Sequence, residues 1–358
     1  MGMAICRVLA ASSDAQGIAV VRNRVAAAAV GALVGAGVEI RIGSVGDRTT
    51  AADLVGDCQA VVNCAFASGG GVLESRRANF EIFDGVQQAA PDAFFVHLSS
   101  VAVYGPGPAD ADQPKPDSSY GKEKLEHERY LLSHVRAERL LLIRLGHVYG
   151  ADTPVSRFIL DCLLEPNFEL PVPDDAAANA VSIDAVAASL VQACLLRTPT
   201  GLHHLADQPN GSWRRLFDLH AETFGLPQAR ACLEYSAPET ERLLPALVAT
   251  LRSCVVLPDL SALSTNLAVR KGLDSLLAVA PAVVEGRIRR WYKARVVGGQ
   301  AGATGTDGMA IPNWLHIGPV GGRHIPVPDH AALNGEALAA WGRRVLDPRW
   351  SFAADNNN

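Results

Sequence analysis

The sequence predicts an α/β protein, with a Rossmann-like doubly wound parallel sheet and a smaller mixed C-terminal lobe. Two observations carry this prediction. Short, almost continuously apolar segments alternate with helix-like segments through the first half of the chain, and strands of that kind belong to parallel sheets covered on both faces. The chain is also long enough, at 358 residues with 49% of them hydrophobic, to bury a large core.

The apolar segments give the expected strands, and the segments between them give the expected helices. The strands are predicted at residues 5–11, 38–42, 60–65, 94–99, 140–145, 180–184 and 201–206. The helices are predicted at residues 17–34, 51–55, 78–89, 120–133, 185–196 and 213–224, and a further helical pattern covers residues 240–297.

These elements divide the chain into two expected domains and a tail. Residues 1–170 are predicted to form a Rossmann-like dinucleotide-binding domain. Residues 171–352 form a substrate-binding lobe and a helical extension that interleave with the first domain, and residues 298–308 in this part read as a mobile loop rich in Gly, Ala and Thr. Residues 353–358 are expected to be a disordered tail.

Composition excludes several classes of protein. The net charge of -5 and the pI near 6.1 give no basic surface for nucleic acid, and the basic run at residues 287–293 reads as a solvated helix end rather than a lipid contact. The longest apolar run, residues 25–38, is too short to span a bilayer. No signal peptide is predicted, and the seven scattered cysteines fit reduced, buried thiols, so we expect a cytoplasmic protein.

The most informative pattern is a tyrosine and a lysine four residues apart. Tyr120 and Lys124 lie one turn apart on one face of the predicted helix, and Ser100 ends a predicted strand about twenty residues earlier. Six tyrosines and five lysines would give only about 0.08 such pairs by chance at this helical spacing. A nearby ammonium lowers the pKa of a phenol and makes it useful in proton transfer. The alternative is a surface helix with solvated Lys122, Glu123 and Lys124.

Three motifs resemble those of the extended short-chain dehydrogenase/reductase family, in its branch of nucleotide-sugar epimerases and dehydratases. They are Ser99-Ser100-Val101-Ala102-Val103-Tyr104-Gly105, Tyr120-Gly121-Lys122-Glu123-Lys124 and Arg144-Leu145-Gly146-His147-Val148-Tyr149-Gly150. Asn63-Cys64-Ala65 is similar to the family's Asn-x-Ala strand end beside the cofactor. The resemblance covers residues 5 to 225, and the Ser/Tyr/Lys segment is its specific part.

The resemblance implies roles for these residues. Tyr120 would be the general acid/base at a substrate hydroxyl or carbonyl, Lys124 would favour its phenolate and bind the nicotinamide ribose, and Ser100 would orient the substrate oxygen. NAD or NADP would carry the hydride, and a homodimer through the tyrosine-bearing helix is implied. Further residues implied at the cofactor are Ala11, Ser12, Gly17, Asp47, Asn63 and Ala65, and those implied at the substrate are Val101, His147 and Tyr149.

The cofactor part of the chain departs from the family pattern. Residues 11–17 stand where the family has its Gly-x-x-Gly-x-x-Gly motif, and only Gly17 is left, while Asp14 would repel a pyrophosphate. Too few residues separate the 38–42 strand from Gly46-Asp47, as though a helix and part of a strand were missing. No acidic residue follows Ile42 to select NAD over NADP, and Arg41 and Arg48 are either solvated or ligands of a 2′-phosphate.

The substrate part departs from the pattern as well. Residues 176–180 hold no arginine to bind the diphosphate of a nucleotide sugar, and His147 replaces the usual asparagine. His97, on a buried strand, is expected to be a core histidine. His203 and His204 have no third ligand at a suitable spacing, so no metal is predicted.

Two functions remain open from the sequence. The first is an NAD(P)-dependent epimerase, dehydratase or reductase acting at a secondary alcohol or ketone of a small molecule, possibly a nucleotide-linked sugar. The second is a relative on the same fold with weak or lost nicotinamide binding, which does cofactor-free acid/base chemistry or serves as a binding subunit. The eroded glycine motif favours the second function, and the intact Ser/Tyr/Lys set favours the first.

Overall fold

The computed structural model describes residues 1–67, 72–109, 113–165, 168–170, 172–206, 211–230, 317–320, 323–325, 327 and 335–346. The chain divides into two units, the first of Met1–Cys64, Glu81–Leu233 and Asn313–Asn358, and the second of Ala65–Phe80 and Glu234–Pro312. The helical pattern at 240–297, the loop at 298–308 and the tail at 353–358 lie outside the described residues. The domain boundary at residue 170 stays a prediction.

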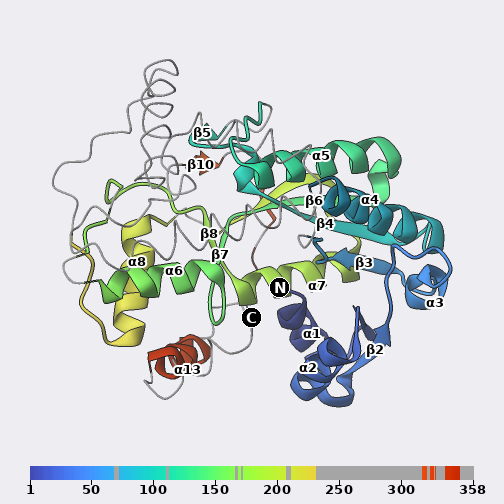
Figure 1. The fold of residues 1–358 in the computed structure, drawn as a ribbon, viewed down its shortest axis with the longest axis horizontal. Coiled ribbons are helices and arrows are strands. Elements are labelled where there is room, and N and C mark those ends of the chain that lie inside the picture. The colour runs from blue at the N-terminus through green and yellow to red at the C-terminus, as the bar shows by residue number, and fades with distance from the viewer. Residues whose placement is uncertain are drawn as a thin grey trace, which may run out of the picture. The chain divides into compact units, whose positions relative to one another are not determined.

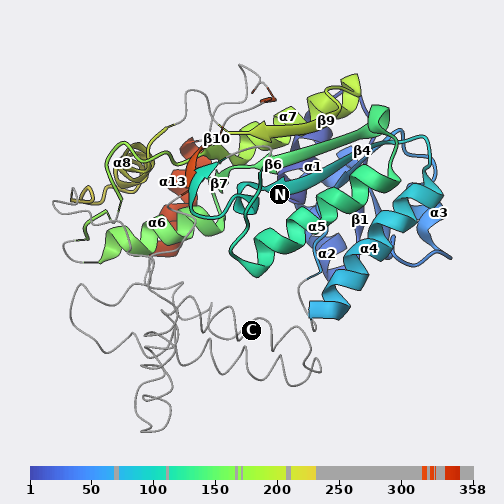
Figure 2. The same cartoon turned by 90° about the horizontal axis from the view of Figure 1, so that it is seen from above.

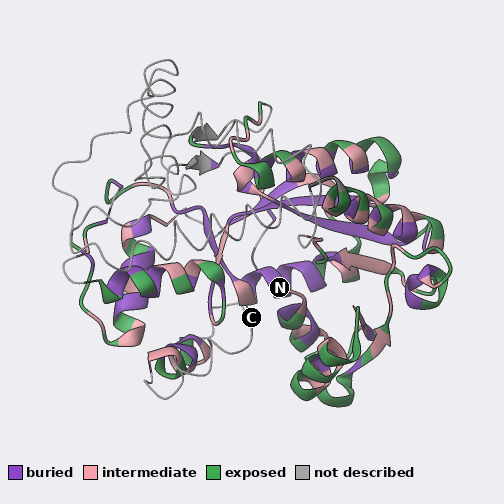
Figure 3. Ribbon diagram, viewed as in Figure 1, coloured by how far each residue is buried: buried purple, intermediate pink, exposed green. Residues whose placement is uncertain are grey.

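A parallel sheet of four strands forms the centre of the first unit, in the order β3-β4-β6-β9. Figure 1 labels β3, β4 and β6, and Figure 2 labels β9 beside β6. Its strands are β3 (Ala60–Asn63), β4 (Phe94–Ser100), β6 (Leu140–Leu145) and β9 (Gly201–Leu205). β4 and β6 are buried along almost their whole length (Figure 3), because they lie in the middle of a sheet that is covered on both faces. The predicted α/β class and parallel sheet are confirmed, and each of these four strands lies where the sequence predicts it.

Helices cover the two faces of this sheet, and the side chains of β4 show which helix lies where. Phe94, Val96 and Leu98 pack with α1 (Gly2–Ala11) and α7 (Ile183–Leu196) in one core cluster. Phe95 and His97 instead contact Phe83 of α4 (Val72–Ala89), and α5 (Ser119–His134) packs beside α4 on that side (Figure 2). Successive residues of a strand point to opposite faces, which is why β4 can bind both layers.

The N-terminal region differs from the prediction. Residues 5–11, predicted as the first strand, belong to helix α1, and the predicted helix at 17–34 is instead β1 (Gly17–Val21) followed by α2 (Arg24–Val34). β1 pairs in parallel with β2 (Val38–Ile42), and a 3-10 turn, Gly35–Gly37, connects α2 to β2.

The physical reason lies in the spacing of the apolar residues. Ala4 and Ile5 are buried and Val8 and Leu9 are half-buried against the same core, and a spacing of four residues is that of a helix face. A short apolar run does not distinguish this pattern from a strand. The strand-forming residues are instead Ile18 to Val21, where β-branched side chains predominate.

The remaining elements complete the first unit. After β2 come α3 (Ala51–Val55), the 3-10 turn η2 (Val101–Val103) and a second such turn, Ala137–Arg139. A smaller cluster is built from α6 (Pro154–Leu164), α8 (Trp213–Phe224) and the strand pair β7 (His147–Tyr149) and β8 (Ala180–Ser182). α13 (Gly335–Leu346) packs on α8, and β10 (Ile317–Val320) pairs with β5 (Gly107–Ala109). Ser212 caps α8.

Candidate active site

Ser100 stands at the carboxyl end of β4, where the strand gives way to η2. Its backbone is still extended, and its hydroxyl accepts a hydrogen bond from the backbone N–H of Ala102 at 3.2 Å. The apolar residues before it fix the strand in the core, so the hydroxyl is held at the edge of the sheet. Ligands of parallel α/β folds bind at this edge.

Tyr120 and Lys124 come to the same edge on α5. The helix begins at Ser118, whose hydroxyl accepts a hydrogen bond from the N–H of Gly121 at 3.0 Å. A side chain at Gly121 would lie 2.3 Å from the carbonyl oxygen of Ala102. Glycine at this position therefore lets the first turn of α5 approach η2, and the phenol of Tyr120 reaches a hydrogen bond with Ser100. The structure brings the predicted serine, tyrosine and lysine together.

Lys124 lies one turn further along α5 and is only 6% exposed. Its ammonium donates a hydrogen bond to the carbonyl oxygen of Leu98 at 2.9 Å and lies 5.7 Å from the centre of the Tyr120 ring. Burial lowers the pKa of this amine to about 8, against the opposite influence of Glu123, Cys64 and Glu128. The lysine is therefore a positioned group, and the alternative of solvated charges does not describe it.

The proton on Tyr120 is held more firmly than the sequence predicts. Partial removal from water raises the pKa of the phenol above its ordinary value, although 44% of the residue is exposed, and the hydrogen bond with Ser100 lowers it less. We expected a lowered pKa because Lys124 lies nearby, but in the protein without ligand the net shift is upward. At neutral pH the phenol is a proton donor.

A buried polar network connects the elements that carry these residues. Arg144 of β6 makes two hydrogen bonds to the carboxylate of Glu128, at 3.0 and 2.7 Å, and a third to the hydroxyl of Tyr104 at 2.8 Å. Ser99 donates to the same carboxylate, and the Tyr104 hydroxyl is also bonded to His204. Burial and the charge of Arg144 lower the pKa of His204 to about 4. Because this ring is neutral, the network holds a single ion pair and ties α5 to β4 and β6.

The end of β3 adds a second side to the site. Asn63 is buried and its amide lies 3.3 Å from Nδ1 of His97, whereas Cys64 and Ala65 are exposed. His97 is a core histidine, as predicted. The exposed Cys64 corrects the expectation that the thiols are all buried. Helix α1 begins here, since a side chain at Gly2 would lie 3.8 Å from the Cβ of Cys64.

The residues predicted to form the glycine-rich phosphate loop lie elsewhere. Ala11 ends α1, and Ser12 and Gly17 lead into β1. Because α1 starts beside Cys64 and is ten residues long, its last residue lies about 15 Å from that edge. These three residues thus stand at the opposite end of the helix from Ser100, and the predicted strand-turn-helix at this point is not formed.

The apparent deletion after β2 has the same explanation. β2 is followed directly by the turn that holds Asp47, so no helix is missing between them: β1 and α2 supply the elements that the sequence reading lacked. The carboxylate of Asp47 accepts hydrogen bonds from the backbone and the hydroxyl of Thr49, which lower its pKa.

The three residues predicted to bind the substrate differ in how accessible their side chains are. Val101 is buried in a cluster with Tyr104 and Leu125, and Tyr149 is buried against α6 and α8. His147 is half-buried, with its ring 5.2 Å from that of Trp213. Of the three side chains, His147 alone lies partly open to solvent.

One family model matches the part of the chain that carries Ser100, Tyr120 and Lys124. Residues 1–165 match the family model described as NAD dependent epimerase/dehydratase family. The match covers less than half of the 358 residues and shows what this part of the chain is similar to. A comparison with curated proteins found no match.

Solved structures of the epimerase/dehydratase family and of similar proteins share the fold. The protein gox2253 has 19% sequence identity and a TM-score of 0.53, and the match covers 71% of this chain and 80% of that one. UDP-N-acetylglucosamine 4-epimerase from Methanobrevibacter ruminantium M1, solved with UDP-N-acetylmuramic acid, has 15% identity and a TM-score of 0.51, over 66% of this chain and 83% of that one. At such identities the likeness shows the fold alone.

The matched family is described as NAD dependent, and the residues at this edge fit such a cofactor in part. The first turn of α1 has no side-chain cap. The N–H groups of Ala4 and Ile5 donate to the carbonyl oxygen of Met1, which leaves those of Gly2 and Met3 for an anion, and Gly2 leaves ordinary space beside Cys64. Lys124 and the Tyr120 hydroxyl lie at the same edge. Within the described ranges, no group of three His, Cys, Asp or Glu side chains could hold a metal ion.

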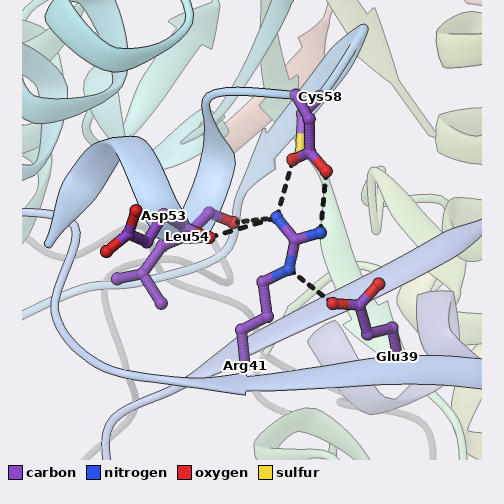
Figure 4. A network of polar contacts seen from close by, with 6 residues as sticks. Glu39, Arg41, Asp53, Leu54 and Cys58 are labelled. Atoms are coloured by element: carbon purple, nitrogen blue, oxygen red, sulfur yellow. Dashed lines mark hydrogen bonds and ion pairs between the residues drawn. The ribbon is translucent and has the colours of Figure 1, made fainter.

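Sequence reasoning placed a helix over Arg22 and Arg24, which in the structure follow strand β1. The signal was present in residues 17–22, a glycine and four apolar residues followed by arginine, which is the pattern of a strand ending at a sheet edge. The arginine that was considered instead, Arg41, is engaged: it makes two hydrogen bonds to Asp57 and one to Glu39, at 2.6, 2.8 and 2.7 Å (Figure 4).

Proposed function

We propose that the protein transfers hydride between a nicotinamide cofactor and a secondary alcohol or ketone, with Tyr120 as the acid/base. The observation that carries the proposal is the convergence of Ser100, Tyr120 and Lys124 at the carboxyl edge of the sheet. Bound NAD or NADP would supply or accept the hydride, and every proton would be handled by the chain itself.

In the reducing direction, the Tyr120 phenol gives its proton to the substrate oxygen while the carbon receives hydride. The raised pKa of the phenol favours this direction, because the proton is present at neutral pH. Ser100 binds the same oxygen and orients it, and Lys124 offsets the charge that develops on the phenolate. In the oxidising direction, Tyr120 must first lose its proton, which the Lys124 ammonium favours.

Our inference about the substrate class rests on the side chains of residues 176–180. Residues 176–180 pack against α8, where the carbonyl oxygen of Ala176 accepts a hydrogen bond from the N–H of Trp213, and Ala178 and Ala180 are buried. No charged side chain in this segment could bind a diphosphate. We therefore infer a small secondary alcohol or ketone, and a nucleotide-linked sugar is included only if another part of the chain binds its diphosphate.

Cytoplasmic location and a homodimer through α5 complete the proposal. Leu125 and Leu131 are taken up by the core, while Leu132 is 55% exposed and is available to a second copy. None of the helices in the described part of the chain is long and apolar enough to cross a membrane.

The test is a matched pair of tyrosine variants on one helix. Tyr120→Phe should abolish turnover of a panel of secondary alcohols, UDP-glucose and UDP-glucuronic acid, yet keep cofactor affinity by calorimetry. Tyr130→Phe is the control, since its hydroxyl binds Asp84 and it lies ten residues along α5, about 15 Å away. Turnover that survives in Tyr120→Phe would refute the assignment, and failure to bind any nicotinamide nucleotide at millimolar concentration would favour the cofactor-free alternative.

A further inference from the structure

Three residues of α5 line the face of the helix that meets the sheet. Tyr120, Lys124 and Glu128 follow one another at a spacing of four residues, so they lie one above the other on that helix. The Lys124 ammonium donates a hydrogen bond to the carbonyl oxygen of Leu98 at 2.9 Å, and the Glu128 carboxylate accepts one from the hydroxyl of Ser99. The helix is therefore fixed against the last residues of β4 at more than one point.

Glu128 is held by a buried ion pair with Arg144 of β6. Arg144 stands opposite Ser99 in the parallel register of β4 and β6, and its Nε and Nη2 donate to the two carboxylate oxygens at 3.0 and 2.7 Å. The side chains of Arg144 and Glu128 are only 3% and 2% exposed. Such a pair is weak evidence of stability, because well-packed apolar residues of similar volume often replace one without loss. Its presence beside the site therefore indicates another role.

The same guanidinium also reaches the turn that follows Ser100. Its Nη1 donates to the hydroxyl of Tyr104 at 2.8 Å, and its Cζ lies 5.0 Å from the centre of that ring. Tyr104 ends η2 and packs with Val101 in one buried cluster. The ion pair thus binds both elements that carry the site, since Glu128 belongs to α5 and Tyr104 to the end of η2.

The charges around the Lys124 amine give Glu128 a second effect. The titratable groups that face this amine come from α5, the end of β3 and β4, and they are Tyr120, Glu123, Glu128, Cys64 and His97. Desolvation raises the pKa of the Cys64 thiol to about 11 and lowers that of the His97 ring well below its ordinary value, so both are neutral at pH 7. Among the described residues, the charges that face the amine are therefore two carboxylates, and Glu128 is the buried one.

We propose that Glu128 and Arg144 are positioning residues of this site: the pair holds α5 against β4 and η2, and Glu128 supplies the negative charge that keeps Lys124 an ammonium. The proposal deepens the proposed function and rests on it, because the acid/base site is the same. Both side chains act through the groups that they hold in place, and the proton itself is moved by Tyr120.

The first test measures the charge of Lys124 and needs neither cofactor nor turnover. Trace acetylation with acetic anhydride at a series of pH values, followed by mass spectrometry, gives the pH at which this amine loses its proton, about 8 in the original protein. Glu128→Gln removes the carboxylate charge at nearly constant size and should lower that value by about one pH unit. Lys122, exposed on the same helix, is the internal control and should be labelled alike in both proteins.

A double variant separates positioning from folding. Glu128→Leu/Arg144→Met replaces the pair by apolar side chains of similar volume, so the melting temperature should not fall, yet Lys124 should still lose its proton at a lower pH than in the original protein. With a secondary alcohol that the original protein turns over, kcat should fall at least about tenfold while KM stays within about threefold. Arg136→Gln is the matched control, because Arg136 pairs with Asp92 at 3.0 Å on the exposed surface, and it should change neither quantity.

Two results would overturn the proposal: a Lys124 that loses its proton at the original pH in Glu128→Gln, or a double variant with full turnover. If Glu128→Gln does not fold, the double variant decides both points. The proposed function fails separately, through absence of nicotinamide binding or through turnover that survives in Tyr120→Phe, and neither of these changes the acetylation result.

Discussion

The amine of Lys124 meets two opposing demands. It is almost completely buried, which costs free energy for the charged form, yet it must be charged to favour the phenolate of Tyr120. A pKa of about 8 is the compromise between burial and the nearby carboxylates of Glu123 and Glu128. At pH 7 the amine of Lys124 is charged in most molecules, and one pH unit above 8 it is neutral in most of them.

We therefore expect cofactor affinity to fall as the pH rises through about 8. The physical reason is that neutral Lys124 loses the charge with which it binds the ribose and the phenolate. Fluorescence titration with the reduced nucleotide between pH 6.5 and 9.5 measures this. Lys124→Arg should remove the decline, because an arginine keeps its charge over this range. Affinity that stays constant up to pH 9.5 in the unchanged protein would contradict the assignment.

Gly121 determines how closely α5 and η2 approach each other. The first turn of α5 lies so close to η2 that a side chain at Gly121 would be 2.3 Å from the carbonyl oxygen of Ala102, and backbone cannot yield as a flexible side chain can. The same contact brings Tyr120 to Ser100. The positions of the catalytic groups therefore depend on the contact between the first turn of α5 and η2, as well as on the catalytic side chains themselves.

Gly121→Ala should accordingly reduce turnover far more than cofactor affinity and destabilise the protein by about 1–3 kcal/mol, through forced separation of α5 from η2. Urea unfolding and kinetics measure the two effects. The matched control is Gly31→Ala in α2, where the added Cβ would have only an ordinary contact, 3.5 Å from Ile40. There the substitution should stabilise the protein by about 0.5–1 kcal/mol. Equal effects of both substitutions would disprove the close-contact explanation.

How far the sequence predicts an element depends on how local its signal is. The Tyr120 and Lys124 pair was predictable because it is set by helical spacing within one turn, and β4 because apolar side chains occupy four of its first five positions. Helix α1 was not, because its short apolar run fits a strand equally well, and the phosphate-loop residues and Arg22 were misplaced as a consequence. The pairing of Glu128 with Arg144 joins a helix to a strand that comes after it, and no local pattern reports that.

At the scale of the whole molecule, the described part of the core holds several neutral histidines. His97 lies between β4 and α4, His204 contacts the Tyr104 hydroxyl, and His220 is buried between α6 and α8. Burial lowers the pKa of His97 well below its ordinary value and those of His204 and His220 to about 4. In His220, Nδ1 donates to the carbonyl oxygen of Leu216, so Nε2 must accept from Ser156, and protonation would break that bond.

These histidines make stability depend on pH in a definite direction. Their folded-state pKa lies below the value of about 6.5 in the unfolded chain, so the unfolded state binds more protons between pH 6.5 and 4. The contribution of these histidines to the free energy of unfolding is complete above pH 6.5. It falls as the pH decreases, by about 2 kcal/mol for each of His204 and His220 at pH 5. That is a large part of the 5–15 kcal/mol typical of a folded protein. Urea unfolding at pH 7.5, 6 and 5 should show this loss, and His220→Gln should reduce its slope by about one proton. A free energy of unfolding that is unchanged between pH 7.5 and 5 would mean that these rings are not buried as neutral groups.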